Sequence, residues 1–200
     1  IGRIDSMSLA EGQVGTRVTI SGISLRGSGS NVDTVTLGAH PATIISETDE
    51  SVVVDVTSGS GAGVTVTLTS SSGATVTLLA GWTYLTEGAI NDVQPSSGAE
   101  GTAVAIAGSN LLGGGTSVRS ITLAGTAVAG VTNVIGNEVI TVEVAHASAG
   151  TGAVTIISNT GAVVTSADVW EYLERGTVDS LSPASGMHGT QVTIAGSRML

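Results

Sequence analysis

The first residues to consider for metal binding in this 200-residue chain are its three histidines. His40, His146 and His188 have no second histidine at the spacing that a zinc site uses, and the chain contains no cysteine. These positions predict histidines in turns and loops. We expect none of them to bind a metal ion.

One acidic group is the second candidate. Segment Glu47–Ser51, "ETDES", places three carboxylates within four residues, a density that could meet a hard cation such as calcium. A similar segment further along the chain, Ile135–Glu138, contains a single acid. We therefore favour a solvated acidic turn over a calcium site.

Motifs of catalysis are missing from the sequence. No Gly-x-Ser-x-Gly elbow stands between a predicted strand and a predicted helix. The glycine stretch Leu111–Ser117, "LLGGGTS", lacks the lysine and the helix of a phosphate-binding loop, and it predicts a flexible surface loop. We therefore expect no catalytic residues, no cofactor-binding residues and no metal ligands, in a chain that is not an enzyme.

Charge and hydropathy narrow the range of partners. The net charge is −10, and the six basic residues, all arginine, are dispersed along the chain. Binding to a phosphate backbone needs clustered cations, so we expect no nucleic-acid partner. No uninterrupted run of about 18 apolar residues occurs, so we expect no direct membrane insertion of this segment.

A repeat organises the chain. The motif Gly-x-x-Gly-Thr begins at Gly12, at Gly98 and at Gly186, in steps of 86 and 88 residues. Within the repeats, Val64–Ser70 and Val139–Val144 alternate apolar and polar residues. A period of two is typical of antiparallel strands with one buried face, so each repeat predicts a small β-sandwich.

The large aromatic residues recur with the repeat. Trp82 and Tyr84 close the first copy, and Trp170 and Tyr172 close the second. The chain has no phenylalanine, so few other large side chains are present to fill a core. We expect these four rings to lie in the cores and not to form sugar-stacking platforms.

The order of these landmarks resembles the IPT/TIG domain. This is the immunoglobulin-like fold of plexins, of fibrocystin-like surface proteins and of the dimerisation half of Rel-type transcription factors. The pattern opens on Pro-x-x-Gly-x-x-Gly-Thr and continues through a valine-rich strand and a glycine-punctuated hairpin, and the first two copies close on aromatic-x-Tyr. The first copy departs from the pattern, because Leu9 stands where the later copies have Pro95 and Pro183.

The resemblance covers Ile4–Leu85, Ile90–Leu173 and the opening of a third copy. It implies an all-β fold of tandem immunoglobulin-like (E-set) β-sandwiches. The expected domains are residues 1–87, residues 88–175 and residues 176–200, the last being the first strands of a truncated third domain.

The resemblance also implies a structural or adhesive module of an extracellular or cell-surface protein with many repeats. Its partners would be other protein chains or neighbouring repeats of the same array, and its serines and threonines offer hydroxyls for O-linked glycans. A ciliary or cell-wall surface filament is one form of such an array. The alternative is a carbohydrate-binding or spacer domain of a secreted enzyme, whereas the negative charge argues against a Rel-like DNA-binding module.

The junctions between copies keep their length. Segments Thr83–Ala89, "TYLTEGA", and Glu171–Thr177, "EYLERGT", share Tyr, Leu and Gly at the same places. A linker that fixes an angle must keep its length, whereas a flexible tether need not. We therefore expect a stiff rod with nearly the same rotation at both junctions.

Overall fold

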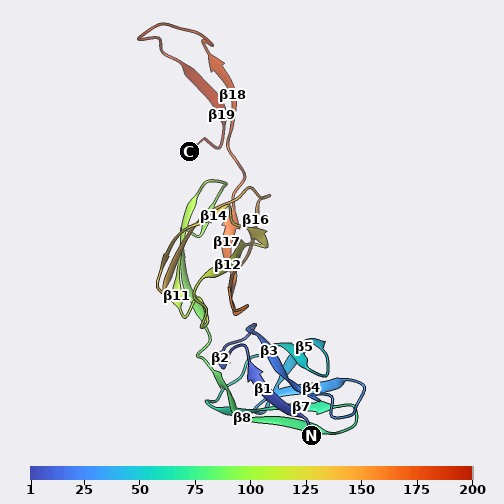
Figure 1. Cartoon of the computed structure of the whole chain (residues 1–200). Coiled ribbons are helices and arrows are strands. Elements are labelled where there is room, and N and C mark those ends of the chain that lie inside the picture. The colour runs from blue at the N-terminus through green and yellow to red at the C-terminus, as the bar shows by residue number, and fades with distance from the viewer. Residues whose placement is uncertain (200) are drawn as a thin grey trace.

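The computed structural model describes residues 1–199 as two sandwich units followed by an isolated hairpin (Figure 1). The three parts follow one another lengthwise, and the N-terminus lies on the side of the first unit that faces away from the second. The expected all-β fold is confirmed. Among residues 1–199 there is no helix with the length and apolarity that a membrane crossing requires.

The first unit is a single sheet wrapped on itself, in the strand order β1-β3-β6-β5-β4-β7-β8-β2. Its strands are β1 (Arg3–Met7), β2 (Glu11–Gly12), β3 (Arg17–Ile23), β4 (Val32–Leu37), β5 (His40–Glu47), β6 (Ser51–Asp55), β7 (Val64–Ser70) and β8 (Thr75–Tyr84). Strand β5 pairs with β4 through its first residues and with β6 through its last, so it joins the two layers of the sandwich.

The second unit has the same topology in two separate sheets, β10-β17-β16-β12-β13 and β14-β15-β11-β9. Its strands are β9 (Ala89–Gln94), β10 (Ser97–Gly98), β11 (Ala103–Ser109), β12 (Val118–Leu123), β13 (Thr126–Ala127), β14 (Gly130–Ile135), β15 (Val139–Glu143), β16 (Gly150–Ser158) and β17 (Val163–Tyr172). Strands β13 and β14 replace the continuous β5.

The break between β13 and β14 has a local cause. Pro41 in β5 corresponds to Ala127, 86 residues later, because both pair with the same place on the neighbouring strand. Thr43 corresponds to Gly130, 87 residues later, by the same criterion. One extra residue therefore lies at the crossing between layers, and it separates the two sheets of the second unit.

The hairpin consists of β18 (Thr177–Ser182) and β19 (Thr193–Ser197), paired antiparallel. Its register is irregular between Val178 and Ser180, at the place where β1 and β9 are also irregular. Val178 and Ile194, which correspond to core residues of the complete units, are exposed in the hairpin.

Each sandwich unit has its own apolar core of alternating strand residues. Trp82 in β8 and Trp170 in β17 are both fully buried at 0% exposure, and Tyr172 is buried at 2%. The rings of each Trp and Tyr pair meet edge to face, with centroids 6.1 Å apart in the first unit and 5.6 Å in the second. The prediction that these aromatics fill the cores is confirmed for both tryptophans and for Tyr172, whereas Tyr84 is half-buried against the first core.

The repeated Gly-x-x-Gly-Thr motif forms the same turn three times. Gly15, Gly101 and Gly189 have φ values of +83°, +85° and +88°, a region that residues with a side chain rarely adopt. In the second unit the Thr102 side-chain oxygen accepts the Ala99 backbone N–H at 3.2 Å. The motif therefore recurs because one backbone conformation and one threonine hydroxyl close each turn.

Replacing Gly101 with valine is expected to destabilise the second unit by about 1–3 kcal/mol, because the side chain would be held at positive φ. No heavy atom lies within 4 Å of the position that its Cβ would take, so the cost comes from the backbone conformation alone. A thermal melt of the second unit measures it. Gly130→Val is the control, since Gly130 has neither positive φ nor a close neighbour, and an equal shift in both variants would contradict this reading.

Candidate functional site at the domain junction

The three histidines lie far apart in the fold and in unrelated surroundings. His40 packs edge-on against Tyr84, with ring centroids 5.4 Å apart. His146 lies 3.6 Å from the Glu100 carboxylate, and His188 is exposed in the turn that precedes β19. Within residues 1–199 no group of three or more His, Asp or Glu side chains is placed to hold a metal ion.

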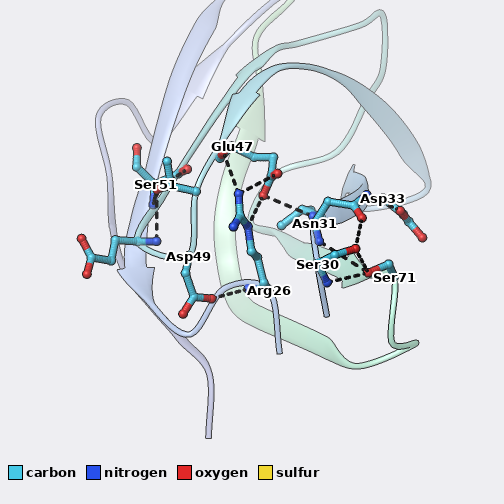
Figure 2. Close-up of polar contacts among 11 residues, drawn as sticks. Arg26, Ser30, Asn31, Asp33, Glu47, Asp49, Ser51 and Ser71 are labelled. Atoms are coloured by element: carbon cyan, nitrogen blue, oxygen red, sulfur yellow. Dashed lines mark hydrogen bonds and ion pairs between the residues drawn. The ribbon is translucent and has the colours of Figure 1, made fainter. Parts of the chain in front are cut away.

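The acidic segment is engaged by an arginine. Both Glu47 carboxylate oxygens accept hydrogen bonds from the Arg26 guanidinium, at 2.9 and 3.0 Å (Figure 2). The Asp49 carboxylate accepts the Arg26 backbone N–H at 2.9 Å. The expected solvated turn is correct for Asp49 and Glu50, which are exposed, but wrong for Glu47, which ends strand β5 in an ion pair.

The pair gives the first unit a pH dependence with a definite sign. The hydrogen bond from Arg26 holds the pKa of Glu47 below its ordinary value. A carboxylate with a lowered pKa stabilises the fold above its unfolded pKa, and this contribution is lost as the pH falls through the folded pKa.

We expect Glu47→Gln to lower the melting temperature of the first unit at pH 7 and to have less effect at pH 3. Melting curves at the two pH values measure this. Glu50→Gln, an exposed neighbour in the same turn, is the matched control. An effect of Glu47→Gln that does not change with pH would contradict the assignment.

The glycine stretch Leu111–Ser117 is a surface loop only in its second half, where Gly114, Thr116 and Ser117 are exposed. Leu111 and Leu112 are buried in the core of the second unit, with 0% and 6% exposure. Gly113 is also buried, and a Cβ on it would come within 2.5 Å of the side-chain amide carbon of Gln13 in the first unit. This stretch therefore forms part of the contact between the two units.

The contact centres on Gln13, which lies in the first Gly-x-x-Gly-Thr loop and is 0% exposed. Its side-chain N–H donates to the Val163 carbonyl oxygen at 3.2 Å. Its side-chain oxygen accepts the Gly88 backbone N–H at 2.7 Å. A buried amide with both ends hydrogen-bonded across a junction fixes position as well as contributing stability, because leaving either end unpaired is costly.

Two backbone hydrogen bonds flank this glutamine. Val163 N–H donates to the Val14 carbonyl at 3.0 Å, and Arg17 N–H donates to the Thr160 carbonyl at 2.9 Å. The Gly-x-x-Gly-Thr loop of the first unit is thus bonded directly to the turn between β16 and β17. The linker is held as well, since Leu85 N–H donates to the Gly12 carbonyl at 2.8 Å.

The second junction is built differently. Ala99 occupies the place of Gln13, and the neighbouring Glu100 pairs with Arg175 at 2.9 Å. Figure 1 shows the hairpin continuing the direction of β17, whereas β8, the counterpart of β17 at the first junction, lies across that direction. Equal rotation at both junctions, expected from the linker sequences, is therefore not what the structure shows.

No signal in the sequence singled out Gln13. It lies at the variable second place of the motif, where the later copies have Ala99 and Met187. A glutamine in a glycine turn normally predicts a solvent-exposed side chain. The third place varies in the same way, with Val14, Glu100 and His188, so variation between copies did not mark Gln13.

Comparisons with known proteins agree with this architecture. The sequence model of the IPT/TIG domain matches residues 3–84 and 89–172, which are the two sandwich units. No similar sequence was found among curated proteins.

Among solved structures, the full extracellular region of plexin A4, domains 1 to 10, aligns with a TM-score of 0.54 and 19% identity over 92% of this chain. The chain spans 16% of that plexin. SGBP-B from a complex xyloglucan utilization locus in Bacteroides uniformis aligns with a TM-score of 0.36 and 16% identity, over 84% of this chain and 49% of that one. On the match over both units, the chain belongs to the IPT/TIG domain family.

Proposed function

We propose that this chain is a non-catalytic structural or adhesive module of an extracellular or cell-surface protein, in which consecutive IPT/TIG units form a stiff rod. The observation that carries the proposal is the first junction, where a fully buried glutamine bonds to both the linker and the next unit. The fold likeness to an extracellular region of a plexin agrees with the proposed location.

Other protein chains or neighbouring repeats are the partners that such a rod would meet. Threonine and then serine are the most frequent residues at the exposed strand positions, and they offer hydroxyls for O-linked glycans. Assembly into a surface filament is the finer form of the same proposal.

The alternative, a carbohydrate-binding or spacer domain of a secreted enzyme, finds less support in the geometry. Recognition of a sugar ring by stacking needs an exposed aromatic face. Trp82 and Trp170 are fully buried and Tyr172 is nearly so, while the half-buried Tyr84 packs edge-on against Trp82 and His40.

Replacing Gln13 with alanine is expected to loosen the first junction, because Gly88 N–H and the Val163 carbonyl would lose their partner. The chain has no native cysteine, so spin labels at Glu11→Cys and Arg119→Cys, both exposed sites, report the distance between the units. We expect a narrow distance distribution that broadens in Gln13→Ala and stays narrow in Gln94→Ala, an exposed glutamine. A broad distribution without any substitution at Gln13 would overturn the stiff rod.

A further inference from the structure

The first unit carries an open cavity of about 540 Å³ at the pole that bears the N-terminus. We call it the pole cavity. Gly2, Ser24, Gly27, Ala74 and Thr75 contribute to its lining. Figure 1 shows this N-terminal pole facing away from the second unit, so the intramolecular junction does not use it.

Four residues of the pole cavity are the repeat equivalents of four residues that surround Gln13 in the second unit. By steps of 86 or 88 residues, Gly2 corresponds to Gly88, Gly27 to Gly113, Ala74 to Ala162 and Thr75 to Val163. In the second unit this set is the receptor for the loop of the preceding unit. The first unit therefore contains the counterparts of these four receptor residues.

The backbone of the receptor is the same in both units. Gly27 has a φ of +49° and Gly113 a φ of +52°. Gly27 N–H donates to the Ser24 carbonyl at 3.0 Å, and Gly113 N–H donates to the Asn110 carbonyl at 2.9 Å. At this glycine turn the backbone of the pole cavity therefore matches the backbone that accepts Gln13 in the second unit.

One wall of the cavity is also fixed in the same way. The Asp49 carboxylate accepts the Arg26 backbone N–H, and in the second unit the Asn137 side-chain oxygen accepts the Leu112 backbone N–H at 2.8 Å. The Arg26 side chain lies along Glu47, which holds its guanidinium in a two-point ion pair (Figure 2). The Arg26 side chain is therefore held by Glu47 and need not move before a loop can enter the cavity.

We infer that the pole cavity binds the Gly-x-x-Gly-Thr loop of another IPT/TIG unit, one with glutamine at the second place of the loop. The amide oxygen would accept Gly2 N–H, and the amide N–H would donate to the Thr75 carbonyl, beside Gly27 and Ala74. The inference rests on the proposed function, because it extends the rod by a unit on the N-terminal side.

The loops of this chain show why glutamine is the side chain that fits. Alanine, as at Ala99, is too short to reach the receptor, and methionine, as at Met187, has no amide that could hydrogen-bond to both Gly2 and Thr75.

The pole cavity differs from the receptor of the second unit at a position near the linker. Ser28 stands where Gly114 lies beside Leu85 in the second unit, so the linker leucine of an incoming unit must adopt another rotamer.

A fusion tests the inference. Residues 1–86 are placed directly before Ile1 of the full chain, so that the fused linker continues Thr86-Ile1-Gly2 where the native one reads Thr86-Glu87-Gly88. Spin labels at Glu11→Cys of the fused unit and Asp33→Cys of the following unit measure the new junction. Asp33 corresponds to Arg119 and is likewise exposed, so labels at Glu11→Cys and Arg119→Cys across the native junction serve as the internal standard.

We expect the new pair to give the same narrow distance as the native pair, and Gln13→Ala in the fused unit alone to broaden only the new distance. A broad new distance beside a narrow native one would overturn this inference and leave the proposed function standing. Broad distances at both junctions would overturn both. Gln13→Met in the fused unit that keeps the new distance narrow would overturn the role of the amide hydrogen bonds.

Discussion

Replacing Gly108 with valine is expected to destabilise the second unit by about 3 kcal/mol or more, at or above the upper end of the usual cost of overpacking. A Cβ on Gly108 would overlap the carbonyl oxygen of Ala89 in the adjacent strand β9. The pairing of β9 with β11 is irregular at this glycine, and the two backbones approach closely there. Strand β9 would have to move away, which exposes Val93, buried at 4%.

The chain supplies its own probe for this experiment. It has two tryptophans, one in each unit, so in a Trp82→Phe background the fluorescence of Trp170 reports the second unit alone. Denaturant unfolding of Gly108→Val and of the control Gly130→Val gives the difference in stability. If Gly108→Val unfolds at the same denaturant concentration as the control, close approach of the strands is not what requires this glycine.

Trp170→Ala is expected to cost the second unit about 3–5 kcal/mol, because it removes the largest fully buried side chain of that core and leaves a cavity. Tyr172 also loses the ring that it meets edge to face, at an interplanar angle of 88°. The first unit has a separate core, so its unfolding is expected to stay close to that of the unchanged chain.

Fluorescence of the remaining Trp82 follows the first unit in this variant, and circular dichroism follows the whole chain. Leu173→Ala is the control, since Leu173 is 44% exposed and its removal is expected to change stability by about 0.5 kcal/mol or less. Equal destabilisation of the two units by Trp170→Ala would mean that they unfold as one body, contrary to the independent cores.

The sequence predicted those parts of the fold that depend on local pattern. Alternating valines placed the strands, the recurring glycine turn gave the repeat, and the scarcity of large side chains placed both tryptophans in the cores. These features depend on residues that are close together in the chain, so they can be predicted from a single sequence.

Contacts between residues that are far apart in the chain could not be predicted from the sequence. Glu47 reads as part of an acidic turn because nothing nearby shows that Arg26, 21 residues earlier, lies across from it. Gln13 reads as a surface residue because its partner Val163 is 150 residues away. The sequence of Leu111–Gly113 predicts a surface loop because the burial of these residues comes from the other unit as well as from their own.

The parallel pairing of β2 with β8, and of β10 with β17, decides how each unit would respond to tension along the chain. In the first unit, Thr83 N–H donates to the Ala10 carbonyl and Leu85 N–H to the Gly12 carbonyl, at 2.9 and 2.8 Å. Pulling the two ends of the unit apart slides these parallel strands past each other, so the bonds bear load together instead of opening one by one. Forced unfolding depends on the barrier and not on equilibrium stability, so this short clamp sets mechanical strength separately from the core.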